Sequence, residues 1–258
     1  MEELKQYQLG RRTMLAWLDE IETKGTIAIS LHVPAKSDGA SGKAVIQINR
    51  PEFQLPDALI RRIETSPTGA ALLYSQEMLY ILLPPFPLQQ SVALNRCEVN
   101  PLRDLLKNER VCAMLLIRLG AYAIAVAEGE TVLASKVGTG NVHARHRQGG
   151  SSAKRFQRHR EKQIEYFFTR VCGHAREIIE PFARQLNYVI LDGEDNTIRT
   201  FRQQCHFIET FHDRILDRKL DIREPRRSTL DKAIYNLWST RIIEWPIPQD
   251  RETKHKNI

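Results

Sequence analysis

The sequence predicts an α/β or α+β fold in which a mixed β-sheet is flanked by helices. Short apolar segments typical of strands recur through the first half of the chain. A long helical pattern then extends from about Ser152 to Arg184, and a glycine pair, Gly149-Gly150, precedes it. The order of strands, loop, long helix, strand and further helices indicates a sheet covered by helices.

The chain has 258 residues, which is enough for one large domain or two small ones. We expect a smaller N-terminal α/β subdomain over residues 1–108, a second domain over residues 109–247 and a polar tail over residues 248–258. Apolar runs stay shorter than the roughly 18–20 residues that span a bilayer. The acidic start, Met1-Glu2-Glu3, does not resemble a signal peptide. We therefore expect a cytoplasmic protein with no membrane partner.

The N-terminal subdomain begins with an amphipathic pattern that predicts a helix over residues 2–24. Alternating residues predict a strand over Thr26–Val33, and a second strand is predicted over Ala44–Ile48 after a Ser- and Gly-containing loop. The remaining elements are two short helices and a hairpin, predicted over Pro56–Ile63, Pro101–Lys107, and Ala70–Tyr74 with Met78–Leu83.

The second domain begins with three strands joined by glycine-containing turns, as in a meander, over Ala113–Ile117, Tyr122–Ala127 and Thr131–Lys136. Apolar residues at helical spacing, Phe156 among them, predict that one face of the long helix packs on a core. We expect Phe156 to pack beneath the glycine loop. A buried strand over Tyr188–Leu191 and helices over Phe201–Leu216 and Ser228–Ile243 complete the domain.

The four cysteines, Cys97, Cys112, Cys172 and Cys205, form no CxxC pair. In a large cytosolic chain we expect buried free thiols rather than disulfides. Cys205-His206 with His212 is a weak alternative as a metal site. We expect no metal and no cofactor.

The formal net charge is +7, which suits a polyanionic partner, and the excess is concentrated before and within the start of the long helix. A one-signed run beside a glycine pair favours contact with nucleic acid over a merely solvated helix face. The candidate RNA-binding residues are Arg145, His146, Arg147, Gln148, Lys154, Arg155, Arg158, Arg160 and Lys162.

The glycine pair lies inside this basic run, in Gln148-Gly149-Gly150-Ser151-Ser152. Two glycines allow backbone angles that other residues avoid and can enter a narrow RNA-lined space. A serine after them can cap the helix. From these residues alone, a flexible linker before a capped helix is the more common interpretation.

The wider string HARHRQGGSSAKRFQRHR, residues 143–160, resembles the catalytic stretch of the eukaryotic and archaeal class 1 peptide release factors. In that family, basic residues precede Gly-Gly-Gln-Ser-Ala, which is followed by an Arg-Phe pair and a basic helix. Gly149-Gly150 matches the two glycines, Ser152-Ala153 the residues after the glutamine, and Arg155-Phe156 the Arg-Phe pair. Met114–Ser135 resembles the strands before the loop, and Gly25–Pro34 resembles a strand of the family's first domain.

The resemblance implies a catalytic loop of Gly149, Gly150, Ser151 and Ser152 that reaches the peptidyl transferase centre of the large ribosomal subunit. The family's glutamine is replaced by Ser151, and the later position used by the ankyrin-and-zinc-finger peptidyl-tRNA hydrolases is Ser152. No stop-codon-reading motif is found, and the sequence ends before the family's third domain. We therefore expect a codon-independent peptidyl-tRNA hydrolase acting on stalled ribosomes. The alternatives are a non-catalytic ribosome-rescue factor and a general RNA-binding protein.

Overall fold

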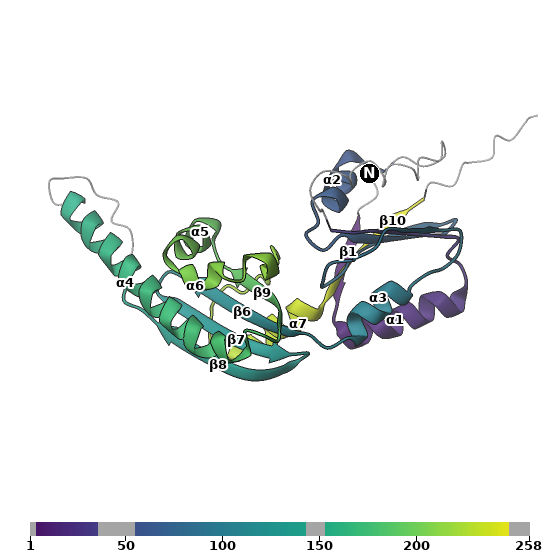
Figure 1. The fold of residues 1–258 in the computed structure, drawn as a ribbon. Helices are drawn as coiled ribbons and strands as arrows, with labels where there is room; N and C mark the ends of the chain where they lie inside the picture. Colours follow the sequence, from purple (N-terminus) through teal and green to yellow (C-terminus); the bar gives the residue numbers. More distant parts are fainter. Residues whose placement is uncertain (1–3, 36–54, 143–152, 248–258) are drawn as a thin grey trace, which may run out of the picture. The chain divides into compact units, whose positions relative to one another are not determined.

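A computed structural model describes residues 4–35, 55–142 and 153–247 (Figure 1). The strand predicted over Ala44–Ile48 and the glycine loop lie outside these residues. The chain divides into two compact units, residues 1–108 with 238–258, and residues 109–237. The sequence analysis grouped residues 238–247 with the second domain, whereas here they lie in the first unit.

Among the described residues, the first unit contains a six-stranded antiparallel sheet with the order β1-β10-β4-β3-β2-β5. Helix α2 lies on one face of this sheet, and helices α1 and α3 lie on the other (Figure 1). The strands are β1 (Lys5–Leu9), β2 (Ile29–Val33), β3 (Ala70–Tyr74), β4 (Met78–Leu83), β5 (Val92–Leu94) and β10 (Thr240–Pro246). The helices are α1 (Arg11–Lys24), α2 (Asp57–Glu64) and α3 (Asn100–Lys107).

Both ends of the first unit differ from the prediction. Residues 2–24 were expected to form one helix, but β1 precedes α1, with Gly10 between them. Residues 228–243 were also expected to be helical. Only a 3-10 turn (Arg227–Thr229) and α7 (Leu230–Trp238) form there, and then β10 pairs with β1 and β4. Strand β1 is stabilised by its pairing with β10. The two strands lie at opposite ends of the chain, so a local sequence pattern cannot show that pairing.

In the second unit, the described part of the chain forms a four-stranded mixed sheet with the order β8-β7-β6-β9. The predicted meander is confirmed, because β6, β7 and β8 are successively antiparallel, while β9 is parallel to β6. These strands are β6 (Val111–Arg118), β7 (Ala121–Glu128), β8 (Thr131–Thr139) and β9 (Leu186–Asp192). Their interior residues are almost fully buried on both faces of β6 and β7, so this sheet forms the centre of the unit.

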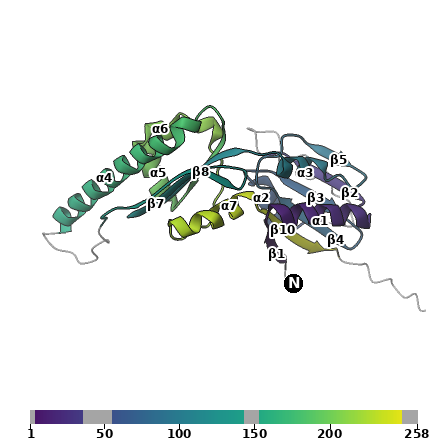
Figure 2. The same cartoon turned by 90° about the horizontal axis from the view of Figure 1, so that it is seen from below.

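The long helix α4 (Ala153–Ile179) packs on β7 and β8. It also contacts α5 (Asp195–Gln204) and α6 (His206–Glu209), and α5 contacts β6. Helix α7 lies on the opposite side of the sheet (Figure 2). Helix α4 ends earlier than predicted and continues as a 3-10 turn (Glu180–Phe182), because Pro181 has no N–H to donate. The helix predicted over residues 201–216 is instead split at Cys205 into α5, α6 and a 3-10 turn (His212–Arg214).

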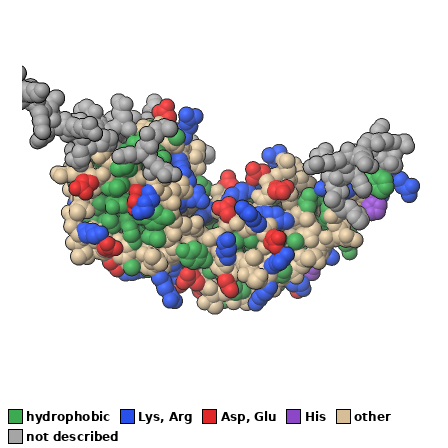
Figure 3. Space-filling view, turned by 180° about the vertical axis from the view of Figure 1, so that it is seen from behind, with side chains coloured by type: hydrophobic (Ala, Val, Ile, Leu, Met, Phe, Trp, Pro, Cys, Tyr) green, Lys and Arg blue, Asp and Glu red, His purple; other side chains and the backbone are tan. Residues whose placement is uncertain are grey.

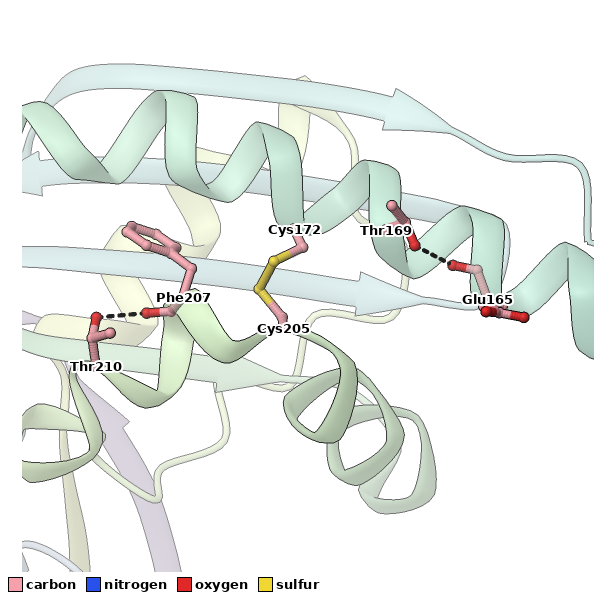
Figure 4. Close-up of a disulfide and its surroundings, with 6 residues drawn as sticks. All are labelled: Glu165, Thr169, Cys172, Cys205, Phe207 and Thr210. Atoms are coloured by element: carbon pink, nitrogen blue, oxygen red, sulfur yellow. Dashed lines mark hydrogen bonds between the residues drawn. A yellow bond between two sulfur atoms is a disulfide. The ribbon is translucent and has the colours of Figure 1, made fainter.

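Two further expectations are corrected by the second unit. Phe156 is 51% exposed, so it does not belong to the core as predicted. Cys172 of α4 and Cys205, between α5 and α6, form a disulfide rather than free thiols (Figure 4). The packing of α4 against α5 and α6 brings their Cα atoms to 5.5 Å, which is the usual separation for a disulfide. Cys97 and Cys112 are free thiols, and Cys112 is buried.

In the described ranges, no helix is long and apolar enough to cross a membrane.

Candidate nucleic-acid interface

The end of β8, from which the chain enters the glycine loop, is fixed by several contacts. The N–H of Gly140 donates to the carbonyl of Gly120 at 2.8 Å. The guanidinium of Arg170, on α4, donates to the carbonyl of Thr139. Val142, the last described residue before the loop, packs against the hydrophobic core of the second unit. The loop therefore departs from a well-anchored strand end.

Gly140 also approaches α4 closely. A Cβ atom at this position would lie 2.4 Å from Cδ2 of Phe167 and 3.2 Å from Nη2 of Arg170. Phe167 is 1% exposed and its ring lies against Tyr122 and Phe168, with centroid distances of 6.1 and 5.6 Å. The strand end and the helix can therefore pack at this distance only because residue 140 has no side chain.

A groove of about 570 Å³ opens between this strand end and the first half of α4. Helical spacing places its residues in two adjacent rows, because positions four apart share a helix face. Arg155, His159, Gln163 and Phe167 form one row, and Arg158, Lys162, Tyr166 and Arg170 form the other; Gly140 and Asn141 supply the opposite wall.

The lining of the groove is strongly basic. Three arginines, a lysine and a histidine line it, and no acidic residue does so within the described part of the chain. In the same part, Arg155, Arg158 and Lys162 form no ion pair. By contrast, the second half of α4 pairs its charges. His174 contacts Glu177 at 3.2 Å, and Lys136 lies 3.8 Å from the same carboxylate. The hydrogen bond to His174 is the larger cause, and the charge of Lys136 the next, of a pKa of Glu177 below its usual value.

The charge is therefore concentrated at the loop end of α4. Figure 3 shows Lys, Arg and His side chains at this end of the second unit, whereas basic and acidic side chains are interspersed over the rest of the face in view. A one-signed groove of this kind attracts a polyanion, since phosphate neutralises the cations and releases counterions.

Aromatic side chains accompany the cations. Tyr166 lines the groove and is 70% exposed, an unusual position for a large ring on a helix that otherwise packs on a core. The buried ring of Phe167 lies on the sheet side of the same groove. Phe156, one turn before Arg160, is also exposed. Basic and aromatic groups in one hollow suit a nucleic acid better than a simple anion.

The structure brings together three of the residues predicted to bind RNA, Arg155, Arg158 and Lys162. Arg160 lies on α4 but does not line the groove. The side chain of Lys154 and the predicted residues Arg145, His146, Arg147, Gln148, Gly149, Gly150, Ser151 and Ser152 lie outside the described structure.

The predicted RNA-binding residues did not include the other lining residues His159, Gln163, Tyr166 and Arg170. The available signal was helical spacing, because these residues lie four or eight positions after Arg155 or Lys162. Asn141 and Gly140 gave no comparable signal, since their position depends on tertiary packing. The weak metal alternative is corrected, because Cys205 is bonded to Cys172. Among the described residues, no group of three or more His, Cys, Asp or Glu side chains is placed to hold a metal ion.

Curated relatives resemble this chain at low identity. Peptide chain release factor subunit 1 of Pyrococcus abyssi is 27% identical over 230 residues, covering 76% of this chain and 54% of that protein. The same factor of Thermococcus sibiricus is 25% identical, covering 77% of this chain and 55% of that protein. The chain thus spans about half the length of these relatives.

Two solved structures resemble the fold only loosely. The crystal structure of archaeal translation termination factor aRF1 covers 82% of this chain and 65% of its own, at 18% identity and a TM-score of 0.35. The Vms1 mitochondrial localization core covers 77% of this chain and 88% of its own, at 13% identity and a TM-score of 0.40. Since these scores are low, family membership depends on the sequence matches.

A family model described as Actinobacteria/chloroflexi VLRF1 release factor matches residues 110–243, just over half of the chain. The match covers the meander, the glycine loop, the whole of α4 and the groove along it. The chain therefore belongs to the Actinobacteria/chloroflexi VLRF1 release factor family.

Proposed function

We propose that this protein is a codon-independent peptidyl-tRNA hydrolase that acts in the cytoplasm on stalled ribosomes or large subunits. Its Gly149-Gly150 loop would lie at the ester between peptide and tRNA. The observation that carries the proposal is the basic groove at the loop end of α4, directly after the glycine pair and inside the family match. A basic surface next to the loop suits a site that is lined by RNA, because its cations can contact phosphates while the loop approaches the ester.

The proposed chemistry is attack of water on the ester carbonyl, which releases the peptide acid and leaves the tRNA hydroxyl. Negative charge develops on the carbonyl oxygen in the transition state, and backbone N–H groups after the glycines are suited to stabilise it. The hydroxyl of Ser151 or Ser152 would orient the water. The proposed stabilisation depends mainly on backbone groups, so it does not require the glutamine of the class 1 release factor motif.

The basic residues on either side of the loop would hold it against RNA. Arg155, Arg158 and Lys162 contribute from the groove. The sequence adds further candidates around the loop and on the first turns of α4, namely Arg145, His146, Arg147, Gln148, Lys154 and Arg160. Several such cations together would make ribosome binding strongly salt-dependent.

A second candidate function is a ribosome-rescue factor that binds without hydrolysis. The specific observation in its favour is that Ser151 occupies the position of the glutamine in the class 1 release factor motif that residues 143–160 resemble. Beyond Cβ, glutamine carries a methylene group and a carboxamide, whereas serine carries only a hydroxyl, so the serine side chain reaches less far toward the ester. Under this alternative the groove keeps its role in binding, and the loop has no catalytic one.

A peptide-release assay on ribosome-bound peptidyl-tRNA separates the two functions. The hydrolase proposal expects release by the wild type and a large loss in Gly149→Ala/Gly150→Ala. Gly173→Ala on α4 is a matched control, since a Cβ there meets nothing within 4 Å. Ser151→Ala should lose one water-orienting hydrogen bond, worth on the order of 1–3 kcal/mol, or roughly five- to 150-fold in rate.

Ser151→Gln restores the Gly-Gly-Gln motif of the class 1 release factors and should match or exceed the wild-type rate. A wild type that binds large subunits without releasing peptide would establish the binding factor instead. Full release by both the double glycine variant and Ser151→Ala would refute the loop mechanism.

A further inference from the structure

We infer that the groove along α4 binds a short single-stranded RNA segment, with phosphates at Arg155, Arg158 and Lys162 and one base stacked on Tyr166. This inference depends on the proposed function for the identity of the polyanion as RNA, and it deepens that function by naming the form of RNA that the groove takes. It assigns Tyr166 as a base-stacking residue.

The arrangement of the cations favours an extended strand. The lining residues run from Arg155 to Arg170 along one side of α4. At 1.5 Å per residue this length is about 22 Å, close to the lower limit of about four nucleotides in known single-strand sites. The acidic residues of the same stretch, Glu161 and Glu165, do not line the groove. A phosphate backbone can therefore follow the row without meeting a carboxylate from it.

Tyr166 supplies an aromatic surface on which a base can stack, which cations alone do not provide. Its ring is 70% exposed and lies between the cations Lys162 and Arg170 in the same helical row. An exposed ring flanked by cations offers a stacking surface to a base whose phosphates contact its neighbours. Packing in the core does not account for an aromatic residue at position 166, because Tyr166 is exposed. The next residue, Phe167, is by contrast buried in the core.

The opposite wall keeps the groove open. Gly140 lies over the ring of Phe167, and a Cβ atom there would come within 2.4 Å of it. The contact of Arg170 with the carbonyl of Thr139 fixes this wall to the helix. The hollow beside Tyr166 is thus set by packing inside the unit, and a ligand does not need to create it.

A single strand fits this hollow better than a duplex. Inside a duplex the bases are paired and covered on both faces by their neighbours, so an aromatic side chain can stack only on a terminal pair. A duplex would meet the cations at the rim and leave Tyr166 without a base. The stacking residue therefore discriminates between the two forms, while the cations alone do not.

The test uses the full chain and fluorescein-labelled RNA, either a single-stranded octamer of mixed sequence or the same octamer as a blunt duplex, with binding followed by anisotropy. We expect tighter binding of the single strand. Tyr166→Ala should weaken it roughly five- to 150-fold, the equivalent of about 1–3 kcal/mol per stacked base, and leave duplex binding unchanged. Tyr166→Phe keeps the ring and should stay within about threefold of wild type.

Arg158→Gln/Lys162→Gln should weaken both RNAs and reduce the salt slope of single-strand binding by about 1.4, at about 0.7 per phosphate contact. Circular dichroism confirms that each variant is folded. Equal or tighter duplex binding, or a Tyr166→Ala variant that binds the single strand like wild type, would overturn the inference. The anisotropy assay contains no ribosome, so it is independent of the peptide-release assay. If the protein binds single-stranded RNA as expected but releases no peptide, only the proposed function is contradicted. If it releases peptide but Tyr166→Ala does not weaken RNA binding, only this inference is contradicted.

Discussion

The same substitution at two glycines of the second unit should change stability in opposite directions. Gly140→Ala would place a methyl group 2.4 Å from Cδ2 of Phe167, whose ring is 1% exposed and packed between Tyr122 and Phe168. A comfortable carbon contact is about 3.5–4.0 Å, so strand or ring must move by about 1 Å. Overpacking of this kind costs about 1–3 kcal/mol.

Gly173 provides the matched control. It is exposed in the interior of α4, and a Cβ there meets nothing within 4 Å. Glycine is worse than alanine in a helix interior by about 0.5–1 kcal/mol. Gly173→Ala should therefore stabilise the unit by that amount, while Gly140→Ala destabilises it.

The assay is urea unfolding of the wild type and both variants, followed by circular dichroism. Phe167→Leu adds a decisive comparison, because leucine lacks the ring atoms that the new methyl group would meet. Gly140→Ala should cost less in the Phe167→Leu background, with a coupling of at least about 0.5 kcal/mol. A Gly140→Ala variant as stable as wild type, or one with the same cost in both backgrounds, would refute the packing argument.

Three further outcomes are expected. Phe168→Ala should cost about 3–5 kcal/mol in urea unfolding and Phe156→Ala less than about 1 kcal/mol, since Phe168 is fully buried and Phe156 is 51% exposed; similar losses would contradict the structure. Burial lowers the pKa of His32, so the unfolded chain binds more protons than the folded one near and below the ordinary pKa. The free energy of unfolding should therefore fall as the pH drops below about 6.5. His32→Leu should show a weaker dependence of this free energy on pH, and an unchanged dependence would contradict the contribution of His32. Reduction of Cys172–Cys205, separated by 33 residues, should lower stability by about 3–4 kcal/mol on the chain-entropy estimate, and Cys172→Ala/Cys205→Ala should not respond to reductant.

The centre of the second unit could be predicted from local pattern. The residues of β6 and β7 are continuously apolar, and glycines mark the turns between them. Likewise, the spacing of Phe168, Val171 and Ala175 identifies the buried face of α4. Phe156 follows the same spacing and was wrongly included, because periodicity does not show where a helix extends beyond the sheet that it covers.

The first unit shows why other elements could not be predicted. Lys5 and Glu244 are paired in the register of β1 and β10 although 239 positions separate them. A short strand of mixed polarity resembles the end of a helix until its partner is known. The disulfide was missed for a related reason. Cys172 and Cys205 become neighbours only through the packing of α4 on α5 and α6, and the expected compartment argued against pairing.

For the candidate site, the sequence supplied the cations and the structure supplied their surroundings. Arg155, Arg158 and Lys162 were evident as a charge run, whereas the wall at Gly140 comes from a different strand. Tyr166 was not among the predicted RNA-binding residues. Its significance depends on its exposure, which a sequence does not give.

The contacts at the two ends of the glycine loop indicate how binding and chemistry can be separated in this fold. At the β8 end, Gly140, Thr139 and Val142 are fixed by backbone, guanidinium and core contacts. At the other end, the loop leads into α4, whose middle packs on β7. These contacts are made by residues on either side of the loop. We therefore expect a substitution at Ser151 to change peptide release and to leave RNA binding by the groove unchanged. The peptide-release assay and the anisotropy assay measure these two properties separately, and a Ser151→Ala variant that loses RNA binding would contradict this expectation.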